Sequence, residues 1–95
     1  MLTVVAEMQA KPGKEEALKQ QLLALIEPTR KEEGCVQYDL HVGTDSAGQF
    51  VFYENWTSRE LLDRHLASPH LRAFLAVAGG LLVEPPRIAT YNRIA

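Results

Sequence analysis

The chain has 95 residues, 46% of them hydrophobic and 23% charged, and a formal net charge of −2 at pH 7. This length and composition predict one folded domain over residues 1–95 and exclude a disordered chain, while the single cysteine, Cys35, excludes a small secreted domain stapled by disulfides. The mild acidity and the absence of a dense Lys/Arg cluster argue against nucleic acid as a partner.

The first part of the chain predicts a strand followed by an amphipathic helix. Residues 3–10 are rich in apolar and β-branched side chains, and Pro12 and Gly13 then end the strand. No basic region or long apolar run accompanies this start, so we expect a cytoplasmic protein without a membrane partner. Pro28 is expected to kink or end the helix, and Gly34 to stop it. The apolar stripe of the helix comprises Leu18, Leu22, Leu25 and Ile26.

The middle of the chain predicts a β-hairpin. Residues 35–44 and 49–56 are strands, and the polar residues between them form the turn. One face of the first strand carries Val36, Tyr38, Leu40 and Val42, and the other carries Gln37, Asp39 and His41. One face of the second strand carries Phe50, Phe52, Glu54 and Trp56.

A second helical region follows, with a break in the middle. Thr57 and Glu60, three residues apart, predict a capping box at its start. Pro69 predicts that the helix restarts, and Gly79 that it ends. A last strand covers residues 87–94. The helical stripe comprises Leu61, Leu62, His65, Leu66, Leu71, Phe74, Leu75 and Ala78.

The predicted order β-α-β-β-α-β is that of an α+β, ferredoxin-like split βαβ fold. It has a four-stranded antiparallel sheet with the helices on one face. The other face would mix polar residues such as Gln37 and Asp39 with Val51 and Tyr53. On so small a protein this mixed face favours burial against a second copy, so we expect a homodimer.

No metal or nucleotide site is expected from the sequence. His65 and His70 are five residues apart across a proline, which is not the i, i+4 spacing that places two imidazoles on one helical face. The sequence shows no histidine–carboxylate cluster and no glycine-rich phosphate loop. We therefore expect neither a metal nor another cofactor.

His65 is the strongest candidate for chemistry. It lies on the apolar stripe of its helix, so its ring points toward the sheet, where Trp56 and Glu54 share one strand face. An imidazole there could transfer a proton near neutral pH, although packing alone also explains a buried histidine, tryptophan and salt-bridged glutamate. Tyr38 could add a hydroxyl from the adjacent strand, and His70 is a candidate for the mouth of a pocket.

Three segments carry a resemblance to a known family. Residues 34–38 (GCVQY), 53–58 (YENWTS) and 65–71 (HLASPHL) resemble the antibiotic biosynthesis monooxygenase (ABM) domain, in particular small members similar to quinol monooxygenases and to the autoinducer-2-degrading isomerase. The resemblance implies a dimeric α+β barrel with a pocket between sheet and helices. It also implies oxidation of phenols or quinols by molecular oxygen without metal, flavin or haem.

The resemblance also assigns individual residues. Trp56 corresponds to the tryptophan of polyketide-oxidising members, but Phe52 and Leu62 stand where those members have an asparagine and a tyrosine. His65 matches the histidine of the quinol-oxidising and autoinducer-degrading branches, so the resemblance favours these branches.

The sequence thus predicts a cofactor-independent monooxygenase acting on a quinol, phenol or enolisable small molecule. His65 would be the base, Trp56 and Phe74 apolar walls, and Tyr38 or Asn55 a hydrogen-bond donor. Two alternatives remain: an isomerase of a small phosphorylated ketone, with Arg72 as the phosphate anchor, and a dimeric small-molecule-binding domain without activity. A cavity reached by both His65 and Trp56 would favour catalysis.

Overall fold

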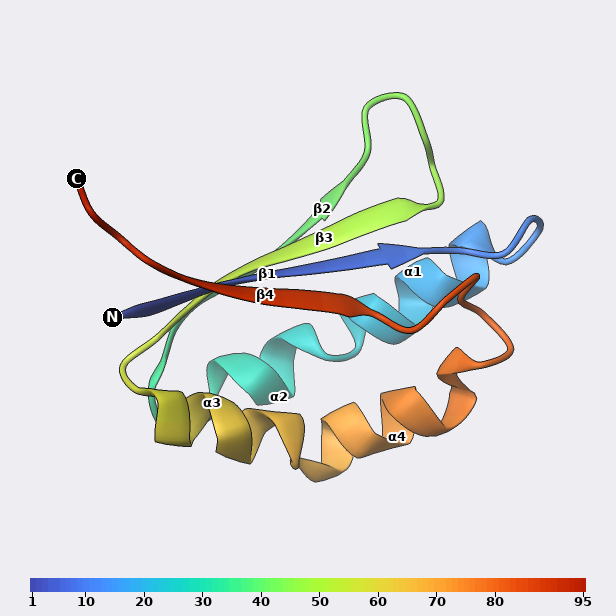
Figure 1. Ribbon diagram of the computed structural model, residues 1–95. Helices are drawn as coiled ribbons and strands as arrows, with labels where there is room; N and C mark the ends of the chain where they lie inside the picture. The colour runs from blue at the N-terminus through green and yellow to red at the C-terminus, as the bar shows by residue number, and fades with distance from the viewer.

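The computed structural model describes all of residues 1–95 and places one sheet over a single layer of helices (Figure 1). The strands are β1 (Leu2–Gln9), β2 (Cys35–Val42), β3 (Gln49–Trp56) and β4 (Arg87–Asn92). The helices are α1 (Glu15–Leu23), α2 (Ile26–Arg30), α3 (Arg59–Leu66) and α4 (Pro69–Ala78). The sheet order β2-β3-β1-β4, with every neighbouring pair antiparallel, confirms the predicted ferredoxin-like α+β fold. With 10 residues α4 is the longest helix, so no helix has the roughly 20 apolar residues needed to cross a bilayer.

Pro28 interrupts the first helical region, but the interruption comes before the proline and not at it. Its nitrogen carries no hydrogen and its ring crowds the carbonyl four residues earlier, that of Ala24, so α1 ends there and α2 starts anew. Between the two helices the backbone tightens, with Leu25 N donating to Leu22 O at 3.1 Å. The predicted apolar stripe survives the break. Its buried or half-buried members are Leu18, Leu22, Leu25 and Ile26.

The predicted apolar face of β2 is wrong at both ends. The pairing with β3 shifts from Cys35 opposite Trp56 to Gln37 opposite Asn55, so Val36 is an extra residue in a bulge. Val36 is therefore exposed and does not lie beside Tyr38. Val42 ends the strand next to the turn and is exposed as well.

Serine side chains, rather than the predicted Thr57, cap the second pair of helices. Ser58 accepts a hydrogen bond from Leu61 N at 3.2 Å and begins α3 one residue later than expected. Ser68 does the same for Leu71 N at 3.4 Å and begins α4, which confirms the predicted restart at Pro69.

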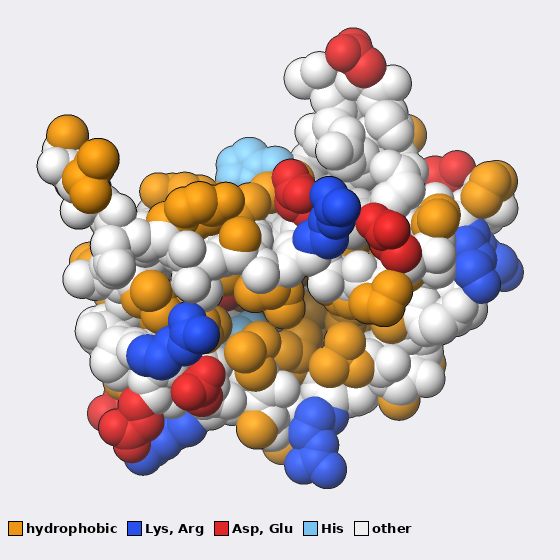
Figure 2. Space-filling view, viewed as in Figure 1, with side chains coloured by type: hydrophobic (Ala, Val, Ile, Leu, Met, Phe, Trp, Pro, Cys, Tyr) orange, Lys and Arg blue, Asp and Glu red, His pale blue; other side chains and the backbone are white.

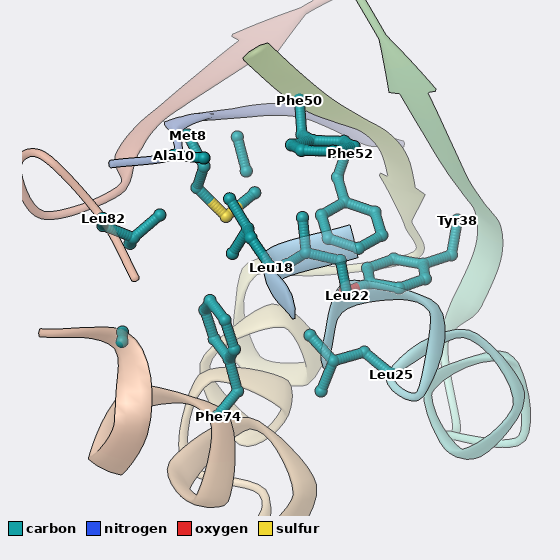
Figure 3. Close-up of a cluster of buried hydrophobic side chains, with 12 residues drawn as sticks. Met8, Ala10, Leu18, Leu22, Leu25, Tyr38, Phe50, Phe52, Phe74 and Leu82 are labelled. Carbon is teal, nitrogen blue, oxygen red and sulfur yellow. The ribbon is translucent and has the colours of Figure 1, made fainter. Parts of the chain in front are cut away.

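The core lies between the sheet and the helices, and β4 takes little part in it. Figure 3 shows Phe50, Phe52 and Met8 reaching from the strands toward Leu22 and Phe74 on the helices. A smaller buried cluster joins Val4, Trp56 and Leu62. Every residue of β4 is exposed, so the helical layer leaves this edge of the sheet uncovered.

Gly34 turns the chain from the α2 end into β2. Its φ of +85° is in the left-handed region, where a side chain is strained. A Cβ at this position would also lie 2.8 Å from Leu61 Cβ and 2.9 Å from Thr57 Oγ1. Gly34 O accepts a hydrogen bond from Thr57 N at 2.9 Å, so this close approach ties the turn to the start of α3.

We expect Gly34→Ala to lower the free energy of unfolding by about 3 kcal/mol, because it combines backbone strain with a steric clash. Gly13→Ala is the matched control: its φ is +83°, but a Cβ there would meet nothing within 4 Å. In Gly13→Ala the free energy of unfolding should fall by only about 1 kcal/mol. Urea unfolding followed by circular dichroism measures both values. Equal losses in the two variants would contradict a packing constraint at Gly34.

Candidate active site

An apolar cavity lies between the sheet and the helices, next to the uncovered edge at β4. Its volume is about 120 Å³. Figure 2 shows a hollow walled by hydrophobic side chains between β4 and the α3–α4 layer, with histidine atoms visible inside. The ionisable side chains of its lining are Tyr38, Glu54 and His65. The apolar lining comprises Ala6, Met8, Leu22, Leu25, Phe52, Leu66, Leu71, Phe74, Leu75, Pro86 and Ile88.

The imidazole of His65 reaches the cavity with its orientation fixed by a carboxylate. His65 is 2% exposed, and its Nδ1 lies 2.7 Å from Oε2 of Glu32, in the turn between α2 and β2. Because a carboxylate accepts, Nδ1 carries the hydrogen and Nε2 keeps its lone pair in the neutral ring. Nε2 has no hydrogen-bond partner within the protein. It is not one of the side-chain atoms that are fully buried without a partner, so it keeps access to open space. The open space beside this ring is the cavity.

The same oxygen of Glu32 also lies 2.8 Å from Nε2 of His70, in the first turn of α4. The helix break at Pro69 allows both imidazoles to face one carboxylate, which corrects the expectation that no histidine–carboxylate cluster exists. Glu32 could not be singled out from the sequence, because it lies in a charged run, Lys31-Glu32-Glu33, that is typical of a solvated surface.

Glu32, His65 and His70 are the residues that could hold a metal ion, since their ligand atoms all lie within 4.8 Å of one another. The 2.7 and 2.8 Å separations are hydrogen-bond lengths. A metal bound about 2.0–2.2 Å from each ligand would need these atoms to move apart. The arrangement fits two imidazoles sharing one carboxylate.

Trp56 lies behind the cavity lining and contacts two of the residues that form it. Its ring stacks on the His65 ring, with centroids 4.8 Å apart and planes 30° apart. Its Nε1 donates to Oε1 of Glu54 at 2.8 Å. The expectation that Trp56 forms a wall of the pocket is therefore corrected: the indole is fully buried and supports the imidazole and the carboxyl from behind.

The remaining candidates divide between the cavity and other places. Phe52, Phe74 and Tyr38 line the cavity, and the Tyr38 ring stacks on Phe52 at 4.4 Å. Leu62 packs beneath Trp56 in the smaller cluster and does not reach the cavity.

Asn55 is on the opposite face of the sheet. There its Oδ1 accepts from Thr3 Oγ1 at 2.6 Å and its Nδ2 donates to Gln37 Oε1 at 2.8 Å, so it cannot donate into the cavity. Arg72 is exposed and outside the cavity lining. Of the two predicted hydrogen-bond donors, Asn55 is thus separated from the site while Tyr38 reaches it, and the predicted phosphate anchor Arg72 is separated as well.

Several known proteins similar to this chain carry monooxygenase names. Residues 1–77 match the model of the antibiotic biosynthesis monooxygenase family. “Putative monooxygenase Rv0793” of Mycobacterium tuberculosis is 40% identical over 84 residues, which are 88% of this chain and 82% of that protein. “Probable quinol monooxygenase YgiN” of Escherichia coli K12 is 32% identical, over 88% of this chain and 90% of that protein. The crystal structure of PA3566 from Pseudomonas aeruginosa superposes with a TM-score of 0.94 and 37% identity, covering 99% of this chain and 94% of that one.

Burial shifts the pKa values of Glu54 and His65, two titratable groups of the cavity, in opposite directions. It raises the pKa of Glu54 from 4.5 to about 7, against the Trp56 hydrogen bond, which lowers it. It lowers the pKa of His65, although the neighbouring Glu32 carboxylate acts in the other direction. Burial also raises the pKa of Tyr38 well above that of a free tyrosine, so its hydroxyl stays protonated.

The raised pKa of Glu54 predicts a stability cost at neutral and higher pH. Because the folded protein holds this proton more tightly than the unfolded chain, the free energy of unfolding falls as pH rises from about 4.5 through about 7. At about 1.4 kcal/mol for each pH unit by which a pKa moves, the loss is about 3 kcal/mol. The lowered pKa of His65 changes stability in the opposite sense as pH rises. This contribution is present in both wild type and the isosteric Glu54→Gln variant, so it cancels in their comparison.

The measurement is urea unfolding of wild type and Glu54→Gln at pH 4.5 and pH 8. Relative to the variant, wild type should become less stable by about 3 kcal/mol at the higher pH. A constant difference between the two proteins would contradict the burial of an ionising carboxyl at this position.

Proposed function

The chain belongs to the antibiotic biosynthesis monooxygenase family, and on that premise we propose a cofactor-independent monooxygenase that oxidises a hydroquinone or related phenol with molecular oxygen. The observation that carries this proposal is the pair of Glu32 and His65 beside an apolar cavity. A buried imidazole held in one tautomer by a carboxylate is suited to accept a proton.

The cavity supports a small, neutral, aromatic substrate. An apolar cavity of about 150 Å³ binds benzene, so a volume of about 120 Å³ is on the scale of a single ring. No lysine or arginine lines it, which leaves an anionic group without a counter-charge. The aromatic faces of Phe52, Phe74 and Tyr38 suit a ring.

Oxidation without a cofactor requires a substrate that is itself the reductant. In the proposed reaction, Nε2 of His65 takes the phenolic proton, and the charge of Glu32 stabilises the imidazolium. The resulting anion gives one electron to oxygen, and the two radicals combine into a carbon–oxygen bond. The apolar lining keeps water away from the anion and the radicals.

The two alternatives receive less support. An isomerase of a phosphorylated ketone needs a cation beside its substrate, and Arg72 lies outside the cavity. A domain that only binds its ligand has no need of a buried imidazole held by a carboxylate beside its cavity. A titratable side chain that is perturbed by burial and by one charged neighbour, such as His65, is typical of sites that perform chemistry.

We also propose that the chain forms a homodimer through the face of the sheet opposite the helices. This face exposes Tyr53 and Tyr91 and leaves Val5 and Val51 half-buried. Apolar side chains gathered on one face of a small domain are typical of an interaction surface.

His65→Ala should lower kcat/KM for oxygen uptake with a hydroquinone by at least about 100-fold, because general base catalysis contributes about 10²–10⁴. An oxygen electrode measures the rate against an enzyme-free blank at each pH. His41→Ala is the matched control, since this histidine is exposed on β2. If His65→Ala keeps the wild-type rate, His65 is not the base.

Glu32→Gln tests the positioning role of the carboxylate. The amide oxygen can still accept from Nδ1, so the ring stays in place, but the negative charge that raises the pKa of His65 is lost. The acid limb of the kcat/KM profile should therefore move to lower pH, with a smaller rate loss than in His65→Ala. A limb that does not move would show that Glu32 has no electrostatic effect on the base.

Tyr53→Asp should convert the dimer into a monomer, because it places a charge in the proposed interface. Leu23→Asp is the matched control, since Leu23 is an exposed apolar residue on α1. Sedimentation velocity gives the mass of each. A monomeric wild type, or a Tyr53→Asp variant that stays dimeric, would contradict this interface.

A further inference from the structure

We propose that Glu54 is the proton donor that completes the reaction begun by His65, delivering a proton to the peroxide formed when oxygen adds to the substrate. This inference rests on the proposed function and adds a second catalytic group to it. The two groups come from different elements, Glu54 from β3 and His65 from α3, and both line the same cavity.

The geometry leaves one oxygen of Glu54 available. The residue is 4% exposed, and its Oε1 accepts from Trp56 Nε1 at 2.8 Å. Oε2 has no hydrogen-bond partner in the protein. Thr29 Oγ1 is the only side-chain polar atom that is fully buried without a hydrogen-bond partner. Because Oε2 of Glu54 has no partner either and is not such an atom, it keeps access to open space. The open space that Glu54 lines is the cavity.

A single rigid side chain sets the relation between the base and the acid. The Trp56 indole stacks on the His65 ring and donates to the Glu54 carboxyl. Fully buried, it cannot reorient without disturbing the core. Trp56 therefore has a role at the site although it does not line the cavity: it holds His65 and Glu54 in a fixed relation to each other.

The surroundings raise the share of Glu54 that is still protonated near neutral pH. Burial raises its pKa to about 7, and the Glu32 charge adds to this effect. The other titratable neighbours are Tyr38 and Cys35 on β2 and His65 on α3, and burial keeps the tyrosine and the thiol neutral. β1, β4, α1 and α4 present only apolar side chains to the cavity. Titratable groups whose pKa values are pushed apart are typical of an acid–base pair.

The complete reaction balances with one quinol and one oxygen molecule. His65 takes the phenolic proton, and the anion and oxygen form a carbon-bound peroxide anion, which Glu54 protonates to a hydroperoxide. The Glu54 carboxylate then takes the hydrogen of the same ring carbon as the O–O bond breaks. The hydroxide that leaves takes the proton from His65 and becomes water. The product is a hydroxyquinone, and both side chains return to their first state.

The test is the pH profile of kcat/KM for oxygen uptake with a hydroquinone panel, after subtraction of the enzyme-free rate. Wild type should give a bell, with the acid limb from His65 and a descending limb near pH 7 from Glu54. Glu54→Gln should lower kcat/KM by about 100-fold and lose the descending limb, while the acid limb remains. Glu16→Gln, an exposed glutamate on α1, is the matched control and should match wild type.

A second variant keeps the proposal testable if Glu54→Gln does not fold. Trp56→Phe keeps an aromatic ring against His65 but removes the N–H donor that lowers the pKa of Glu54. Its descending limb should therefore move to higher pH. An unmoved limb in Trp56→Phe, or a folded Glu54→Gln that keeps both its rate and its descending limb, would overturn the role of Glu54. No oxygen uptake by wild type on any hydroquinone would instead overturn the proposed function.

Discussion

The structure of the site depends on one carboxylate oxygen, Oε2 of Glu32, that lies between two imidazoles. It joins the α2–β2 turn to α3 through His65 and to α4 through His70. The helical layer is thus held together by the contacts of Glu32 with His65 and His70 as well as by apolar packing. A buried polar ring without a partner would destabilise the fold, so the same hydrogen bond holds the helices together and fixes which nitrogen of His65 is free.

Interruptions in the helices make this contact possible. Pro28 splits the first helical region into α1 and the short α2, and Gly34 then reverses the chain where any side chain would clash with Leu61. Pro69 breaks the second region so that His70 faces back toward His65. An unbroken helix would place two residues five apart about 140° from each other around the axis, on different faces.

The periodic parts of the site could be predicted from the sequence, and the contacts between its elements could not. Alternation along β3 placed Glu54 on the helical side, and the stripe of α3 placed His65 opposite it. Period two gives the face of a side chain but not its depth, so Trp56 was expected at the wall and lies behind it. Glu32 left no periodic signal, since only the fold brings its turn beside α3.

Desolvation, a single physical cause, gives the two proton-carrying groups their different roles. Burial disfavours the charged form of any group, so it weakens the acidity of Glu54 and the basicity of His65 at once. Near neutral pH this leaves a carboxyl that still holds its proton in part of the molecules beside an imidazole that lacks one. The stability lost by burying both is a cost of the cavity itself. A wetter cavity would return both groups toward their ordinary pKa values and charge them, so the apolar lining supplied by α1, α4 and the sheet is as much a part of the proposed chemistry as the two groups that titrate.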